Sequence, residues 1–206
     1  QGEKPAVPSA IAKYHATELG REVIKDAMDI HAGKGVILGP RNYLGRAWEG
    51  APISITVEGA NILTRSMIVF GQGAVRCHPY VLKEMQAAAL PDARERLQAF
   101  DTLIWSHVGF ALSNAARAFL LGLVHARFGA APAGAYTAKF YRKLTRYSAT
   151  LALVADTAML TLGGKLKQKE RLSARLGDVL SALYMGSAML KRYEDEGCQA
   201  ADAPLM

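Results

Sequence analysis

The residues best suited to chemistry lie in segment 56–65, which reads TVEGANILTR. It places one carboxylate, Glu58, beside Gly59 at a predicted helix start, among apolar residues and with no cation near it in the sequence. A carboxylate between apolar groups is poorly solvated, which suits a general base. Glu58 is therefore a candidate base, and the alternative is an ordinary acidic residue that favours the positive end of a helix.

Other residues capable of chemistry form weaker patterns. The GKG run at 33–35 lacks the GxxxxGK[ST] order of a Walker loop, and its simplest interpretation is a helix stop. His31 has no nucleophile with a fitting partner, so we expect a packed or capping side chain. His78, His107 and His125 are scattered and fit no metal-ligand spacing, so we predict no metal site.

The cysteines and the apolar segments bound the environment of the chain. Cys77 and Cys198 form neither a disulfide framework nor a ligand pair, which favours a reducing compartment and a cytoplasmic location. The opening ten residues lack the layout of a signal peptide, so we expect the chain to begin inside a longer polypeptide or a mature product. Segment 148–164 is short and mixed for a membrane span, and we expect a buried helix there.

The charge balance points to an anionic neighbour. Lys and Arg number 25 against 18 Asp and Glu, a net charge of +7, which suits a phosphorylated ligand, lipid headgroups or nucleic acid. Lys139, Arg142, Lys143 and Arg146 share one helical face, and a second basic run covers 165–171. This face is either solvated or a peripheral contact with an anionic membrane. The aromatic residues between these cations have helical spacing typical of a core or interface, so we predict no nucleic-acid partner.

The first half of the chain is predicted to contain two helices. Half of the 206 residues are hydrophobic, enough for a sizeable core. An apolar stripe predicts a helix over 9–31, capped by Ser9 and stopped by the glycines at 33 and 35. Segment 38–52 should be a loop with at most a short helix, and 53–57 an extended lead. A second helix should cover 59–75, ending near Gly71 and Gly73.

The second half is predicted to be a helical bundle. After Pro91 the pattern favours long helices over 92–128, 134–162 and 167–196, with turns at 129–135 and 163–164. The fold class is therefore all-α. A subdomain junction is predicted near residues 77–79, which read CHP.

Two segments resemble acyl-CoA dehydrogenases. Many members carry a motif similar to QIFGGNGY, followed some twenty residues later by YEGTxxIxR, and residues 29–36 and 57–65 occupy the corresponding places. The Glu-Gly pair and the later Arg65 match, whereas Asp29, Ala32 and Ala60 depart from the motif. Runs at 26–31, 70–74, 155–157, 163–167 and 172–178 are similar to bacterial-type long-chain members, so the resemblance spans nearly the whole chain.

The resemblance implies a division and a set of site residues. Residues 1–76 would be the C-terminal catalytic helical-bundle portion, and 77–206 an appended α-helical domain. Glu58 would remove the α-proton of the acyl thioester, its backbone N–H would help to hold the thioester oxygen, and residues Ile55, Val57 and Ala60 would form an apolar wall. The residues that would bind the cofactor FAD are Gly33, Gly35, Gly59 and Arg65. Of these, Gly33 and Gly35 would contact the FAD of a neighbouring subunit. Arg65 could also be a solvated residue or a subunit contact.

The implied function is part of a flavin-dependent acyl-CoA dehydrogenase that forms trans-2-enoyl-CoA from long-chain acyl-CoA in fatty-acid β-oxidation. The implied partners are the acyl-CoA substrate, an electron-transfer acceptor and further copies in a homo-oligomer; oxidation by oxygen, as in acyl-CoA oxidases, stays open. The location would be cytoplasmic or peripheral to the inner membrane. The chain alone should be inactive, because the family's amino-terminal helical and middle β-domains carry most of the pocket. The alternative is a non-catalytic helical module for dimerisation or membrane docking.

Overall fold

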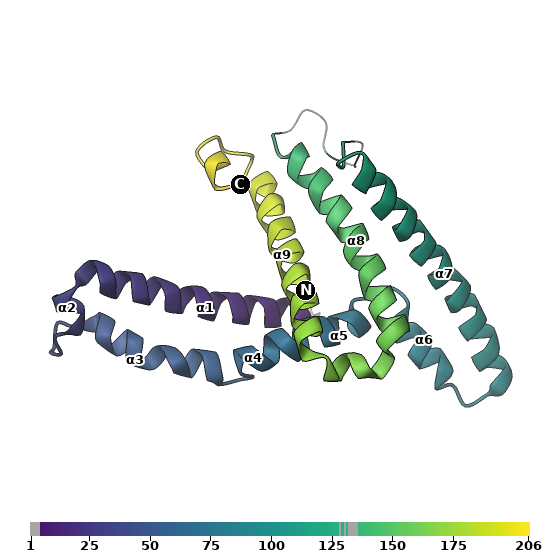
Figure 1. Cartoon of the computed structure of the whole chain (residues 1–206), viewed down its shortest axis with the longest axis horizontal. Coiled ribbons are helices and arrows are strands. Elements are labelled where there is room, and N and C mark those ends of the chain that lie inside the picture. The colour runs from purple at the N-terminus through teal and green to yellow at the C-terminus, as the bar shows by residue number, and fades with distance from the viewer. Residues whose placement is uncertain (1–4, 128, 130, 132–135) are drawn as a thin grey trace.

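A computed structural model describes residues 5–127, 129, 131 and 136–206, and this part of the chain contains helices but no strand, which confirms the all-α prediction. The first elements are α1 (Ala6–His31), α2 (Gly33–Val36), α3 (Tyr43–Thr56), α4 (Asn61–Leu63), the π-helix η1 (Thr64–Ile68) and α5 (Val69–Arg76). They are followed by α6 (Val81–Ala88), α7 (Ala93–Leu123), α8 (Ala138–Leu162), the 3-10 helix η2 (Gly163–Gln168), α9 (Glu170–Asp195) and the short η3 (Ala203–Leu205). Helices α1 and α3 form a hairpin that projects from the bundle of α7, α8 and α9 (Figure 1).

Helix α1 begins earlier than predicted and ends at the predicted residue, but not because of the glycines that follow. It starts at Ala6 after Pro5, so Ser9 lies inside the helix and does not cap it. It ends at His31 because Ala32 takes a positive φ of 47°, a conformation that usually falls to glycine. Gly33 opens the short α2 instead of stopping α1. Gly35 is buried, and a Cβ there would lie 3.2 Å from the Met28 carbonyl oxygen of α1.

Helix α3 replaces the predicted loop and extended lead. Asn42 caps it by accepting a hydrogen bond from the Gly45 N–H at 2.7 Å, and its amide also donates to the carbonyls of Gly35 and Ile37. The helix continues through Pro52, although proline normally weakens a helix interior. Buried Leu44 and Ala51 lie on this helix, which contacts α1. Packing against α1 therefore overrides the local signals of glycine, proline and alternation.

The helix predicted over 59–75 begins at Asn61 and continues as α4, η1 and α5 to Arg76. Gly71 and Gly73 lie inside α5 and do not end it. Gly73 is buried, with a would-be Cβ 3.1 Å from Leu180 Cδ2, so its small size admits α9. The middle of this segment is a π-helix, an uncommon element that is frequent at functional sites.

The predicted bundle is confirmed by α7, α8 and α9. The turn at 163–164 is present as the start of η2, with Gly163 at φ 50°, while the turn predicted at 129–135 lies largely outside the described residues. One buried cluster joins α5, α8, η2 and α9 through Phe70, Ala74, Ala155, Ala158, Leu166 and Leu176. A second joins Val7 and Ile11 of α1 to Val69 of α5. Because the first cluster includes residues on both sides of position 76, α5 shares a core with the bundle; the division at 76 and 77 stays a prediction.

The two basic runs lie at opposite ends of α8. Residues 139–146 form its first two turns, whereas 165–171 follow its end, and the part of α8 between Arg146 and Leu162 separates them by roughly 24 Å at 1.5 Å per residue. They do not form a single patch. By length and composition, the stretch Ala138–Gln168 could cross a membrane. The buried helix predicted over 148–164 is only partly buried: α8 packs against α7 and α9 with Ala149, Ala155 and Ala158 buried, whereas Leu160 is 88 % exposed.

Candidate active site

Glu58 lies on a turn between α3 and α4, not in the first turn of a helix. Its φ is 54° and that of Gly59 is 93°. The left-handed conformation costs a residue with a Cβ about 1–2 kcal/mol, and such strain is typical of functional positions. Glu58 is exposed. The positive φ therefore gives the Glu58 side chain a direction that a residue within α3 or α4 would not have.

The backbone of this turn presents free donors. None of the N–H groups of Glu58, Gly59 and Ala60 donates a hydrogen bond to another described residue. Backbone donors without partners are usually solvated or reserved for a ligand. The turn therefore offers a carboxylate and adjacent N–H groups together.

Lys13 of α1 holds the turn in place through hydrogen bonds from its side chain. Its ammonium donates to the Gly59 carbonyl at 3.0 Å and to Asn61 Oδ1 at 2.6 Å, and it lies 3.5 Å from the Ile55 carbonyl. The buried Asn61 in turn donates to Thr17 Oγ1 at 2.8 Å and to Glu18 Oε1 at 2.9 Å. An ammonium has three protons to donate, so one lysine fixes both ends of the turn. Lys13 and Asn61 were not identified as site residues from the sequence.

The predicted apolar wall is only partly formed. Ile55 and Ala60 are half-buried, whereas Val57 is 47 % exposed. A shallow hollow of about 320 Å³ next to the turn is lined by Tyr14, Glu18, Ile55, Thr56, Ala60, Asn61, Ile62 and Arg65. Burial raises the pKa of Tyr14, which keeps its hydroxyl neutral. Within the described residues nothing encloses Glu58, so the desolvation expected of a base is not supplied by this part of the chain.

Arg65 makes a contact that the sequence did not predict. Its Nε and a terminal nitrogen donate to the two carboxylate oxygens of Asp178 at 2.8 and 2.6 Å. This hydrogen bonding raises the pKa of Arg65, and the paired geometry is the strong arrangement for arginine and carboxylate. The pair joins η1 to α9.

Helix α2, which contains Gly33 and Gly35, lies at the other end of the hairpin from the link between α3 and α4 that carries Glu58 (Figure 1). The 14 residues of α3 separate the two turns by roughly 20 Å, so one chain does not bring them into a single site. Gly33 is exposed and a Cβ there would meet no heavy atom within 4 Å. It can be approached by a ligand, whereas Gly35 packs inside.

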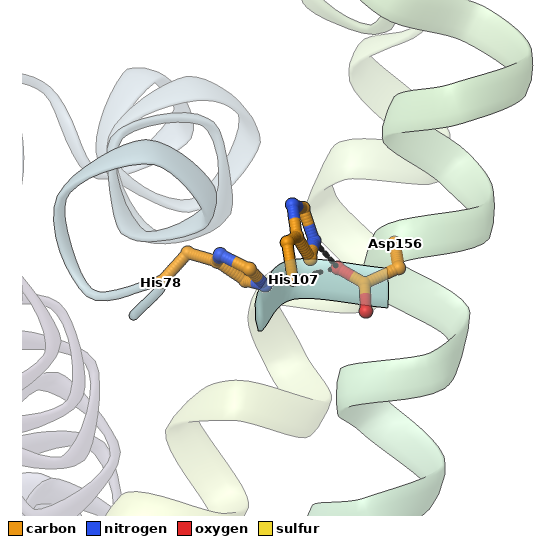
Figure 2. Close-up of side chains that lie close together, drawn as sticks. All are labelled: His78, His107 and Asp156. Atoms are coloured by element: carbon orange, nitrogen blue, oxygen red, sulfur yellow. Dashed lines mark hydrogen bonds and ion pairs between the residues drawn. The ribbon is translucent and has the colours of Figure 1, made fainter. Parts of the chain in front are cut away.

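Two of the histidines thought to be scattered are brought together with Asp156 (Figure 2). His78 Nε2 lies 3.0 Å from Asp156 Oδ1, a short contact that is poorly aligned for a hydrogen bond. His107 Nε2 lies 3.5 Å from the same oxygen, and its Nδ1 lies 2.7 Å from Glu84 Oε1. The side chains of His78 and Asp156 are 7 % and 12 % exposed. The prediction that His78 and His107 are scattered was wrong, because helix packing unites residues far apart in the chain.

The hydrogen bonds of His78 argue against a metal in this cluster. Its Nδ1 accepts from the backbone N–H groups of Tyr80 and Val81, both at 3.2 Å. In a neutral ring Nε2 then carries the proton and has no lone pair for a metal. Only His107 and Asp156 would remain, and a stable zinc site needs at least three protein ligands. Burial, the strongest influence, lowers the pKa of His78, while nearby Asp156 opposes this shift.

Comparison with known families agrees with the helical architecture and the motif around Glu58. A model described as acyl-CoA dehydrogenase, C-terminal, bacterial type matches residues 75–206. A second, described as acyl-CoA dehydrogenase, C-terminal domain, matches residues 1–71. No solved structure matches the chain. Since the two models together account for nearly every residue, the chain belongs to the acyl-CoA dehydrogenase family and corresponds to its C-terminal region.

Proposed function

We propose that this chain supplies the base and one thioester-oxygen donor of a flavin-dependent acyl-CoA dehydrogenase. The observation that carries the proposal is the turn at Glu58 and Gly59. It combines an exposed carboxylate, backbone N–H groups without partners among the described residues, and a lysine that fixes the loop.

The turn has the two groups that α-proton removal requires. An α-proton of a thioester is weakly acidic, so a carboxylate must take it while a donor stabilises the negative charge that develops on the thioester oxygen. The Glu58 carboxylate would accept the proton, and the Glu58 N–H would donate to the oxygen. Lys13 binds the Gly59 carbonyl, which orients the Gly59–Ala60 peptide at the end of the turn. When bound, FAD would supply the acceptor for the hydride that leaves the β-carbon.

The fit of the chain to FAD differs between the predicted cofactor residues. Gly33 is exposed and open, and Gly59 has space, since the nearest atom to a would-be Cβ is Thr64 Oγ1 at 3.7 Å. These two can face a cofactor directly. Gly35 packs on α1 and Arg65 is paired with Asp178, so in this chain they shape the surface rather than present free groups. We propose that Gly33 serves the flavin of a neighbouring subunit, because it lies far from Glu58.

The surface around the turn carries exposed apolar side chains. Ile53, Val57 and Ile62 are 62 %, 47 % and 78 % exposed, and apolar exposure beside a candidate site is typical of a buried interface. We propose that flavin- and substrate-binding domains of the dehydrogenase cover this surface and thereby desolvate Glu58. The preference for long-chain acyl-CoA, the place in β-oxidation, the electron-transfer acceptor and the cytoplasmic or membrane-peripheral location rest on sequence resemblance and composition.

Turnover of a long-chain acyl-CoA by the flavin-loaded dehydrogenase tests the base. Glu58→Gln should lower kcat by about 10²–10⁴-fold, the usual contribution of a positioned acid or base, with flavin content unchanged. Glu49→Gln, which alters an exposed glutamate on α3, should retain activity. If Glu58→Gln retained as much activity as Glu49→Gln and the wild type, Glu58 would not be the base.

A further inference from the structure

Helix α7 carries an exposed apolar face that the proposed chemistry does not use. Its large side chains are between 40 % and 73 % exposed: Leu97, Trp105, Val108, Leu112, Phe119, Leu120 and Leu123. The opposite side of α7 contacts α6 and α8 and includes His107 and the buried Asn114. Figure 1 shows α7 as the outermost helix of the bundle.

The central part of this face has the spacing of a coiled-coil seam. Residues 101, 105, 108, 112, 115 and 119 follow one another at intervals of four, three, four, three and four, and read Asp, Trp, Val, Leu, Ala and Phe. Alternating intervals of three and four keep side chains on one line along a helix and favour packing against a second helix. The helix is 31 residues long, enough for several such repeats.

We propose that α7 binds α7 of a second copy of this chain in an antiparallel pair centred between Val108 and Leu112. In this register Trp105 lies opposite Ala115 of the second copy, and Val108 lies opposite Leu112. The bulky Trp105 then meets the small Ala115, while Phe119 at the end of the seam lies opposite the exposed Asp101, so the central part of the face is complementary to itself. An isologous contact of this kind closes as a dimer.

The sequence of the seam disfavours the parallel alternative. A parallel pair in register would place Trp105 against Trp105 and the Asp101 carboxylate against its own copy. Like charges that face one another across an interface are repulsive, and two bulky indoles would hold the helices apart. The antiparallel pair separates the two carboxylates by 18 positions, about 27 Å at 1.5 Å per residue.

The exposed area matches the need of a stable dimer. Aromatic residues bury about 150–250 Å² each when fully covered, and we take the lower end of this range for Leu and Val. With the exposures given above, the face offers on the order of 800 Å², close to the roughly 800 Å² per partner of a standard interface. The dimer does not depend on the proposed catalytic function.

Light scattering of the 206-residue chain during gel filtration tests the dimer. We expect twice the chain mass for the wild type and a monomer for Leu112→Glu, which brings a carboxylate against Val108 of the second copy. The matched control is Leu160→Glu, since Leu160 of α8 is 88 % exposed and lies off this face; it should remain dimeric. Circular dichroism should show the same helicity in all three.

Distances between spin labels test the orientation. A label at Glu95→Cys, in a chain with Cys77→Ser and Cys198→Ser, should give an interchain distance of about 45 Å for the antiparallel register, against less than about 20 Å for a parallel pair. A monomeric wild type, a dimeric Leu112→Glu or the short distance would overturn the proposal. Binding of a monomeric wild type to phosphatidylglycerol vesicles, lost in Leu112→Glu, would assign the face to a membrane instead.

Discussion

At the scale of single residues, Lys13 and Asn61 explain how an exposed turn keeps one conformation. They lie 48 positions apart in the chain, yet the lysine ammonium is 2.6 Å from the asparagine oxygen. This contact places the positively charged ammonium against the loop in which Glu58 and Gly59 both have positive φ. A catalytic carboxylate on a loop depends on such support, because misplacement by about 1 Å can cost roughly 10²-fold in rate.

Lys13→Met should therefore impair turnover without removing the flavin. We expect kcat to fall by about 10²-fold with little change in KM, since Lys13 holds the turn and does not contact the acyl chain in our proposal. Lys13→Arg should recover part of the loss by donating to the Gly59 carbonyl. Steady-state kinetics at matched flavin content measure this, with Lys25→Met, which alters an exposed residue of α1, as the control. A loss confined to KM would contradict the positioning role.

His78 should make folding stability depend on pH. Burial lowers its pKa in the folded protein, so below about pH 6.5, the ordinary value for histidine, the unfolded chain binds a proton that the folded chain does not. The free energy of unfolding should then fall as the pH is lowered through this range.

His78→Asn keeps an acceptor for the N–H groups of Tyr80 and Val81 but cannot titrate. Denaturant unfolding between pH 7 and 5 should show a shallower loss of stability in this variant than in the wild type. His31→Asn, which changes an exposed histidine, should keep the wild-type slope. The same slope for all three proteins would show that His78 does not contribute.

At the scale of elements, the crossing of α9 over η1 leaves no room for a side chain at Gly177. A Cβ at Gly177 would lie 3.2 Å from the Arg65 carbonyl oxygen. This neighbour is backbone and cannot rotate away. The same crossing places Asp178 against the Arg65 guanidinium, so helix approach and ion pair depend on each other.

Gly177→Ala should destabilise the protein by about 1–3 kcal/mol, the usual range for an overpacked contact. Gly71→Ala is the matched comparison, because a Cβ there meets nothing within 4 Å and alanine favours a helix by about 0.5–1 kcal/mol. Chemical denaturation should therefore move the two midpoints in opposite directions. A stabilised Gly177→Ala would mean that α9 shifts freely over η1.

The long helices could be predicted from the sequence, whereas α3 could not. The apolar periodicity of α1, α7, α8 and α9 is a local property, and it places these helices within a few residues of their observed ends. Segment 43–56 contains glycines and a proline, and it is helical because it packs on α1. Glu58 was recognised by its motif, but Lys13, which supports its turn, comes from α1. The cluster of His78, Glu84, His107 and Asp156 is likewise assembled from four separate segments. Contacts over 48 or 49 positions leave no signal in a single sequence.

At the scale of the whole molecule, the hairpin and the bundle present different surfaces for different purposes. The hairpin holds the turn with Glu58 at one end and the glycines at the other, and in our proposal the two ends would contact the cofactors of neighbouring subunits. The bundle holds the apolar face of α7. The shared core around Phe70 connects the two, so assembly through α7 would also fix the direction in which the hairpins project.

The central claim is that Glu58 removes the α-proton, and anaerobic bleaching of the flavin by a long-chain acyl-CoA in the flavin-loaded dehydrogenase tests it most directly. Bleaching reports reduction of the flavin in a single turnover, independent of the electron acceptor. We predict that Glu58→Gln retains its flavin but bleaches at least about 10²-fold more slowly than wild type. Bleaching at the wild-type rate would place the base elsewhere and leave this turn with a structural role.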